Sequence, residues 1–164
     1  MLRKFFCIFS ACLILLFFDS CQSKNTLNKN HHSEDLAFRL ADAFPLEHGY
    51  ASYDLTATAL YFPESTTCLQ EITVLYSVRP DDYTEIGVFT LQNASDRAVV
   101  TREISAYLQE LRETYAPQAV LYDPSQADKL SAASFKVIGS YMIYAVMTET
   151  EQQHFWKTAQ ALLK

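Results

Sequence analysis

Two pairs of β-strand patterns, each joined by a very short link, constrain the fold of this 164-residue chain most strongly. Residues 72–78 alternate in a period of two and are rich in β-branched residues, and residues 85–91 repeat the signal after a turn-forming Arg-Pro-Asp-Asp. Residues 135–147 form the second pair, which Gly139 and Ser140 divide with the composition of a type II′ turn. Strands joined by such short links run antiparallel. The chain is therefore predicted to contain a small antiparallel sheet of about four strands in two hairpins.

Helix signals surround these strands. The expected helices are Ser33 to Phe44, Asp54 to Tyr61, Asn93 to Pro117, a short helix from Asp123, and a final helix from Thr148. The first residue of each is the predicted N-cap, and Thr148 is followed by Glu151 at the spacing of a capping box. Phe44-Pro45, Pro63 and Pro117 are predicted to end the first three helices. The helices most simply cover one face of the sheet, which predicts an α+β fold.

The N-terminus has the composition of an export signal. Arg3 and Lys4 precede residues 5–18, which are almost wholly apolar. A basic start and an apolar run of roughly 7–15 residues are typical of a secretory signal peptide. This run of fourteen residues is shorter than the about 20 that cross a bilayer as a helix. We therefore divide the chain into a signal peptide (1–20), a flexible polar tether (21–32) and a single α+β domain (33–164).

Cys21 is the predicted attachment point for lipid. The segment Phe18-Asp19-Ser20-Cys21 resembles the lipobox of bacterial lipoproteins, in which a small residue precedes a cysteine that carries diacylglycerol and becomes the mature N-terminus. The family pattern prefers Leu and a small residue at the first two of these positions. Cys12 has a better local match but would leave residues 13–18 as exposed hydrophobics. Two acyl chains anchor a protein stably, so the expected location is the extracytoplasmic face of the cell membrane. A signal peptide without lipidation and an uncleaved anchor are the alternatives.

The charge balance argues against a nucleic-acid partner. The chain has 13 basic and 19 acidic residues, and loss of residues 1–20 would leave 11 and 18. Phosphate binding depends on Lys and Arg, and the few basic residues are dispersed along the chain. We therefore expect no nucleic-acid binding.

Cys68 is the one cysteine downstream of Cys21, so the expected domain contains no disulfide. A nucleophilic cysteine requires an ordered histidine partner. His48 and His154 are the candidates, because the other two histidines fall in the predicted tether. A small hydrolase or redox enzyme that uses Cys68 is therefore one alternative function. A buried or incidental thiol is the simpler interpretation.

Other signals of catalysis or metal binding are weak. Glu151 and His154 have the E-x-x-H spacing of carboxylate-bridged metal sites, but such sites need a second copy of the motif and further carboxylates. The chain has no G-x-S-x-G motif. Its three glycines are too few for a phosphate-binding loop. We expect no catalytic residue, no metal and no cofactor.

Tyrosines provide the remaining candidate site. The chain contains ten of them, and Tyr141 and Tyr144 lie in the second predicted hairpin, where they face opposite sides of the sheet. An exposed tyrosine on a sheet face can stack on a sugar or anchor a partner. These two are therefore the candidate partner-binding residues. The alternative is that both are core residues with hydrated hydroxyls.

Four segments, in this order behind the leader, carry a resemblance to a known family: VLYS (74–77), EIGVF (85–89), YAP (115–117) and VIGSY (137–141). From roughly residue 33 to residue 150, the chain resembles the bacterial lipoprotein family known as domain of unknown function 4358. The resemblance implies a small envelope lipoprotein, typical of Gram-positive bacteria, with no assigned activity.

These observations together predict a membrane-anchored extracytoplasmic lipoprotein that is not an enzyme. Its expected role is to bind a protein, peptide or glycan of the cell envelope, through an open sheet face or an unpaired edge strand. An accessory solute-binding lipoprotein is a further alternative. Such proteins usually have two lobes, for which the 144 residues that follow the predicted signal are too few.

Overall fold

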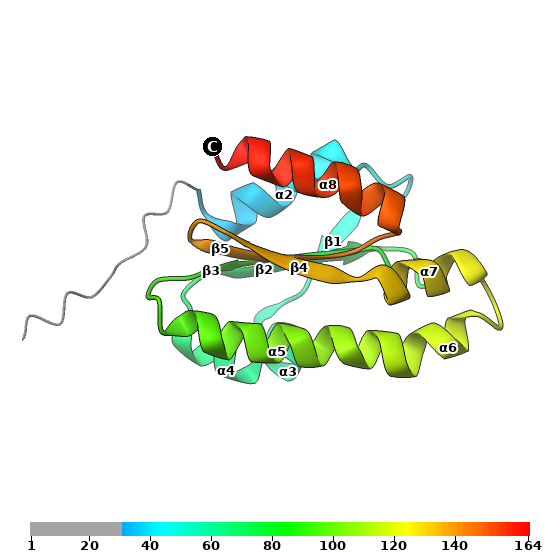
Figure 1. Ribbon diagram of the computed structural model, residues 1–164, viewed down its shortest axis with the longest axis horizontal. Helices are drawn as coiled ribbons and strands as arrows, with labels where there is room; N and C mark the ends of the chain where they lie inside the picture. The colour runs from blue at the N-terminus through cyan, green and yellow to red at the C-terminus, as the bar shows by residue number, and fades with distance from the viewer. Residues whose placement is uncertain (1–30) are drawn as a thin grey trace, which may run out of the picture.

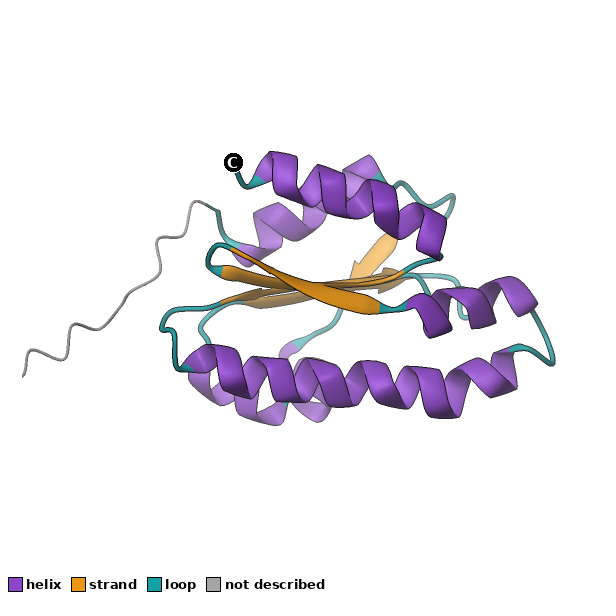
Figure 2. Cartoon of the chain, in the orientation of Figure 1, coloured by secondary structure: helices purple, strands orange, loops and turns teal. Residues whose placement is uncertain are grey.

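The computed structural model describes residues 31–164, which form three layers, with a central sheet between two layers of helices (Figures 1 and 2). The sheet is antiparallel throughout, and its five strands lie in the order β1-β2-β3-β5-β4. The strands are β1 (Tyr50–Ser52), β2 (Ile72–Ser77), β3 (Glu85–Thr90), β4 (Ser134–Ile138) and β5 (Tyr141–Val146). The predicted α+β fold with an antiparallel sheet is confirmed. The predicted signal peptide and Cys21 lie outside the described residues.

Both predicted hairpins are present. In the β4–β5 hairpin, Gly139 has a φ of +60° while Ser140 has a negative φ, as a type II′ turn requires. Pairing of β3 with β5, from Glu85 opposite Val146 to Thr90 opposite Tyr141, joins the two hairpins into one sheet. The fifth strand, β1, was not predicted because its three residues are too short to show an alternation.

The helices cover both faces of the sheet, so the expectation that they cover one face is wrong. On one face lie α2 (Ser33–Ala43) and α8 (Glu149–Leu162). The other face carries α3 (Leu55–Tyr61), α4 (Pro63–Cys68), α5 (Asp96–Glu110), the π-helix η2 (Leu111–Tyr115), α6 (Ala116–Ala119) and α7 (Pro124–Ala132). The reason lies in the central strands, because every residue of β3 and β5 is buried. A sheet with two apolar faces needs cover on both.

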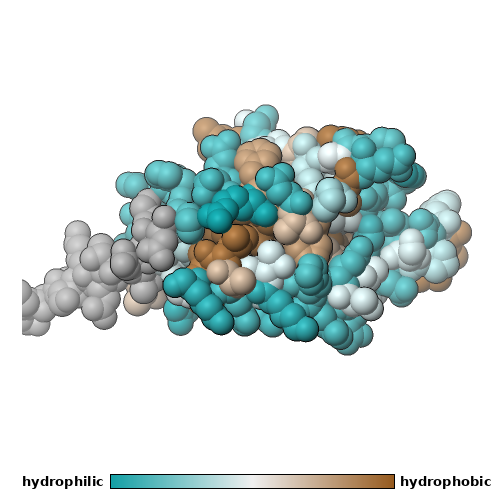
Figure 3. Space-filling view, turned by 90° about the horizontal axis from the view of Figure 1, so that it is seen from above, coloured by the Kyte–Doolittle hydropathy of each residue, from teal (hydrophilic) through white to brown (hydrophobic). Residues whose placement is uncertain are grey.

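Two separate cores result, one on each side of the sheet. Leu36 and Leu40 of α2 pack with Phe155 of α8 in the first core, and Phe62, Phe89 and other apolar residues pack beneath α5 in the second. Figure 3 shows the outer face of the layer formed by α2 and α8, where hydrophilic side chains cover the helices and apolar side chains lie between them.

None of the helices in residues 31–164 has both the length and the apolar composition of a membrane-spanning segment.

Three of the predicted helix N-caps are confirmed. The side chain of Asp54 accepts a hydrogen bond from the Ala57 N–H at the start of α3, and Asp123 likewise accepts from the N–H of Ser125 in α7. Thr148 forms the complete capping box with Glu151 at the start of α8.

The other two predicted caps are wrong. Ser33 is already inside α2, and its hydroxyl is hydrogen-bonded to the hydroxyl of Thr73 at 2.9 Å. At α5 the N-cap position is Ser95, which makes no capping hydrogen bond, and Asp96 accepts hydrogen bonds from the backbone N–H groups of Gln92 and Asn93 in the loop before the helix. Neither helix therefore starts with a side-chain cap, and the side chain of Ser33 makes a tertiary contact instead.

The helix α3 ends at Tyr61, just before Pro63, as predicted, whereas Pro117 does not stop its helix. Pro63 lies in the first turn of a new helix, α4, where its missing N–H costs no hydrogen bond. The long helix passes through the π-helix η2, in which the N–H of Ala116 bonds to the carbonyl of Leu111, and continues as α6. Pro117 thus sits near the start of α6, a position that proline tolerates.

Candidate functional site: a tyrosine pocket around Glu85

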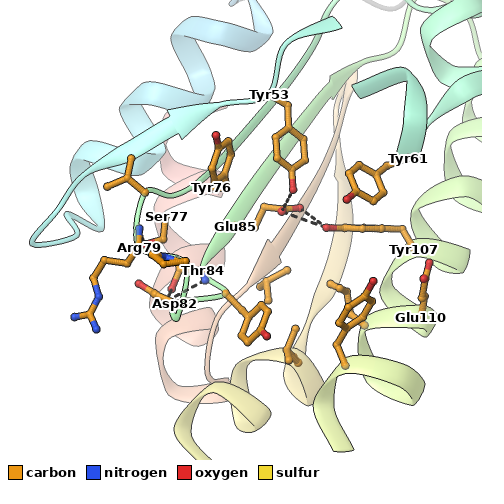
Figure 4. A pocket seen from close by; sticks show the side chains of 17 residues that line it. Tyr53, Tyr61, Tyr76, Ser77, Arg79, Asp82, Thr84, Glu85, Tyr107 and Glu110 are labelled. Carbon is orange, nitrogen blue, oxygen red and sulfur yellow. Dashed lines mark hydrogen bonds between the residues drawn. The ribbon is translucent and has the colours of Figure 1, made fainter. Parts of the chain in front are cut away.

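A cavity of about 370 Å³ lies between the sheet and the C-terminal part of α5 (Figure 4). It is lined by the end of the β2–β3 hairpin, by α5 and by the π-helix. Its lining includes six tyrosines: Tyr53, Tyr61, Tyr76, Tyr83, Tyr107 and Tyr115. We call this cavity the tyrosine pocket. Its volume falls within the roughly 300–1,000 Å³ range of small-molecule sites, and π-helical turns such as η2 are frequent at functional sites.

Glu85, the first residue of β3, lies at the inner end of the pocket and is 6 % exposed. Its carboxylate accepts hydrogen bonds from three tyrosine hydroxyls. Tyr53 donates to Oε2 at 3.0 Å, Tyr107 donates to Oε1 at 3.0 Å, and Tyr144 donates to Oε1. Figure 4 shows the first two hydroxyls approaching the carboxylate from different sides. Within residues 31–164, no Lys, Arg or His side chain pairs with Glu85.

Gly87 allows Tyr144 to reach this carboxylate. Gly87 is opposite Tyr144 in the β3–β5 pairing and lies on the same face of β3 as Glu85. A Cβ atom on Gly87 would be 1.9 Å from the Cε1 atom of the Tyr144 ring. The ring therefore lies across the glycine, in space that a side chain would occupy.

Burial controls the proton affinities of this cluster. Desolvation raises the pKa of Glu85, although the three hydroxyl donors oppose the shift. Burial and the nearby carboxylate raise the pKa values of Tyr53, Tyr107 and Tyr144. These hydroxyls therefore keep their protons and act as donors to Glu85.

The cations at the pocket are already paired. Arg79 forms an ion pair with Asp81, and in Figure 4 its side chain extends away from Glu85. Lys129 bonds to Asp82 at 2.7 Å. Burial alone would raise the pKa of Asp82, but hydrogen bonds from Lys129 and Thr84 outweigh burial and lower it.

Glu110 carries a further negative charge at the pocket. It lines the cavity, is exposed, and has no hydrogen-bond or ion-pair partner within residues 31–164. Glu85 and Glu110 are therefore the acidic groups of the pocket without a cationic partner in residues 31–164.

The predicted partner-binding tyrosines do face opposite sides of the sheet, but neither is exposed. Tyr141 is 3 % exposed and belongs to the core beneath α2 and α8. Tyr144 is fully buried in the other core and bonds to Glu85. The prediction that either ring is available to a partner on the surface is therefore wrong, because both strand faces are covered by helices. The tyrosines that line the pocket come from other segments of the chain.

Tyr141 instead holds the first described residue against the sheet. Its hydroxyl donates to the His31 carbonyl at 2.6 Å and accepts from the His31 N–H at 2.7 Å. His32 lies 3.0 Å from a carboxylate oxygen of Glu71. The last two residues of the predicted tether are thus docked on the domain.

Cys68 lies apart from the pocket lining, at the last residue of α4. The residue is exposed overall, but partial desolvation of its sulfur and the charge of Asp96 raise the pKa of the thiol. A raised pKa reduces the thiolate that a nucleophile requires.

The two histidines proposed as partners for Cys68 lie elsewhere. His154 is on α8, on the opposite side of the sheet, and packs on the ring of Phe44 at 5.1 Å between centroids. His48 is 3.9 Å from Glu47. No group of three or more His, Cys, Asp or Glu side chains in residues 31–164 is arranged to hold a metal ion.

Sequence reasoning missed Glu85 and the pocket. The six lining tyrosines are spread from residue 53 to residue 115, and only the three-dimensional arrangement brings them together. One signal was available: on the inward face of the predicted strand 85–91, Glu85 and Gly87 precede the apolar Phe89. A carboxylate on an otherwise apolar face indicates a buried charge with dedicated donors.

No protein-family model, curated protein or solved structure matches this chain. The resemblance to the lipoprotein family therefore stays a prediction from the quoted segments.

Proposed function

We propose that the protein is a lipid-anchored module on the outer face of the cell membrane that binds a small ligand in the tyrosine pocket. The observation that carries this proposal is the cavity itself, because it combines several tyrosines with a buried carboxylate at its inner end. Convergent polar groups in a well-formed cavity are typical of ligand sites. The N-terminal sequence up to Cys21 supports the location.

Binding without catalysis agrees best with the chemistry of the pocket. The three hydroxyls that contact Glu85 have raised pKa values and stay protonated, so none of them is available as a base. Glu85 itself already accepts hydrogen bonds on both oxygens. An enzyme that uses Cys68 has less support, because its thiol pKa is raised and both proposed histidines have other neighbours.

The anchor is tested by growing cells that express the protein with radiolabelled palmitate. We expect label in the wild-type band and none in the Cys21→Ala variant, with the variant released from the membrane fraction. Equal labelling of the two proteins would contradict acylation at Cys21.

The pocket is tested by thermal unfolding of the full-length protein in a nonionic detergent with added N-acetylglucosamine, D-alanine, glycerol phosphate or choline. We expect at least one compound to raise the unfolding temperature of the wild type. Tyr61→Leu, on the pocket wall, is expected to reduce the shift, whereas Tyr122→Leu, which changes a tyrosine that is 88 % exposed and outside the pocket, leaves it intact. No shift with any compound would count against the proposal.

A further inference from the structure

We propose that the tyrosine pocket binds a small organic cation, with a fully methylated ammonium group as its preferred head. The proposal rests on the binding function argued above and assigns its ligand class. Three features of the pocket carry it: a cluster of aromatic rings, acidic groups without cationic partners, and a carboxylate whose hydrogen-bonding capacity is largely used.

The first feature is a continuous cluster of tyrosine rings along the pocket. Tyr53 stacks on Tyr61, with 5.7 Å between ring centroids, and packs on Tyr76 at 4.8 Å. Tyr61 also contacts Tyr107 at 5.5 Å. All four rings line the cavity. The face of an aromatic ring attracts a cation, and several such rings together form the cages that recognise quaternary ammonium ligands.

The second feature is the sign of the charge at the pocket. Glu85 and Glu110 have no cationic partner within residues 31–164, whereas Arg79 and Lys129 are held by Asp81 and Asp82. The charge of Glu85, which is buried, is screened less by solvent than the exposed charge of Glu110. The pocket therefore favours a positively charged ligand over an anion.

The third feature selects among cations. Tyr53, Tyr107 and Tyr144 already donate to the two oxygens of Glu85. A primary ammonium has three N–H donors that must find acceptors on burial, and these oxygens are largely occupied. A quaternary ammonium has no donor to satisfy, so it gains from the charge and the rings without disturbing the tyrosine hydrogen bonds.

The experiment compares choline with 3,3-dimethylbutan-1-ol, its neutral isostere, by calorimetric titration of the full-length protein in a nonionic detergent. The two molecules have nearly the same shape and differ in the charge of one atom. We expect choline to bind and the isostere to bind at least about 10-fold more weakly, the ratio that corresponds to about 1.4 kcal/mol.

Two substitutions of Tyr61 distinguish the contribution of its aromatic face from the contribution of its apolar surface area. Tyr61→Phe keeps an aromatic face and is expected to bind choline within about twofold of the wild type. Tyr61→Leu keeps apolar area but loses the face, and should weaken binding by about 3- to 30-fold. Tyr122→Leu is the matched control outside the pocket and is expected to leave choline affinity unchanged.

The possible results distinguish the assignment of a cationic ligand from the proposed small-molecule binding function on which it rests. Equal affinity for choline and its isostere overturns the assignment of a cation but leaves a small-molecule site in place. A thermal shift with N-acetylglucosamine, glycerol phosphate or D-alanine and none with choline has the same meaning. If none of these compounds binds, the binding function fails with it. The comparison of the two isosteres uses the wild type, so it stands even where a variant does not fold.

Discussion

At the scale of single residues, the contact between Gly87 and the Tyr144 ring determines how the buried carboxylate is satisfied. The ring occupies the space that a Cβ on Gly87 would fill, and from there its hydroxyl reaches Glu85. The inward-facing pattern of the strand shows the glycine and the glutamate, but not the tyrosine, which comes from a strand more than fifty positions later in the chain. Gly87 and Glu85 could therefore be recognised from the sequence, but their contact with Tyr144 could not.

We expect Gly87→Ala to destabilise the protein by about 1–3 kcal/mol, because the new methyl group overlaps the Tyr144 ring and forces it to move. Urea unfolding measures the loss. In a Tyr144→Ala background the ring is absent, so the same Gly87→Ala change should cost much less. An equal cost in both backgrounds would show that the ring is not the cause.

The raised pKa of Glu85 predicts a pH-dependent stability. A carboxyl group whose pKa is raised on folding binds its proton more tightly in the folded state. Its contribution to stability is complete below the ordinary glutamate pKa of about 4.3 and is lost as the pH rises through the higher folded value. Glu85→Gln keeps the shape and cannot ionise, so it should gain stability relative to the wild type as the pH rises.

The measurement is the free energy of unfolding of wild type and Glu85→Gln between about pH 5 and pH 8, the range above the ordinary glutamate pKa. Glu110→Gln, a change of the same kind at an exposed position, is the control and should follow the wild type closely. A difference between wild type and Glu85→Gln that stays constant or reverses with pH would contradict the direction of the shift.

At the scale of elements, a buried glutamate on α5 caps the short helix α4. The carboxylate of Glu103 accepts hydrogen bonds from the backbone N–H groups of Glu64 and Ser65, each at 2.7 Å, and from the Ser65 hydroxyl. Negative charge is favourable at a helix N-terminus, where N–H groups lack partners within the helix. This contact fixes α4 against α5 on the side of the sheet that carries the pocket.

Glu103→Ala is expected to destabilise the protein by about 1.5–3 kcal/mol, as hydrogen bonds to a charged group are lost and the N–H groups of α4 are left without a partner. Glu110→Ala lies on the same helix, has no described partner, and should change stability by about 0.5 kcal/mol or less. Chemical denaturation compares the two variants. Similar losses in both would mean that the cap contributes little.

Most elements were predictable where a local rule decides them. The hairpin turn at Gly139 and the caps at Asp54, Asp123 and Thr148 depend on neighbouring residues alone, and all four are present. The missed features depend on distant contacts or on an unusual backbone. The strand β1 exists because β2 pairs with it, α4 is capped by Glu103 from α5, and η2 carries the long helix into α6.

At the scale of the whole molecule, Tyr141 holds the start of the described chain against the sheet through both backbone groups of His31. Tyr141→Phe removes both hydrogen bonds and keeps the ring in the core. We expect a loss of about 1 kcal/mol in stability and faster hydrogen exchange at the His31 amide. Tyr122→Phe, at an exposed tyrosine, should change neither. Unchanged exchange in Tyr141→Phe would show that other contacts hold this segment.

The three-layer arrangement and the pocket could not be predicted from the hairpins. Each hairpin follows from a short link, but the pairing of β3 with β5 joins residues that are more than fifty positions apart in the sequence. That pairing creates the two buried faces and therefore places helices on both sides. The pocket forms only after α5 and the π-helix pack over the end of the β2–β3 hairpin.

The docking of His31 has a consequence for how the molecule would be oriented on a cell. Tyr141 and Glu85 lie at opposite ends of the paired strands β3 and β5 and on opposite faces of the sheet. Six paired residues separate these ends by about 17 Å. With Cys21 acylated as proposed, the ten residues from there to His31 reach at most about 36 Å from the lipid. The cavity then lies at the end of the domain farther from the attachment point of the tether, and because this reach exceeds 17 Å, the cavity is free to face solutes that arrive from outside.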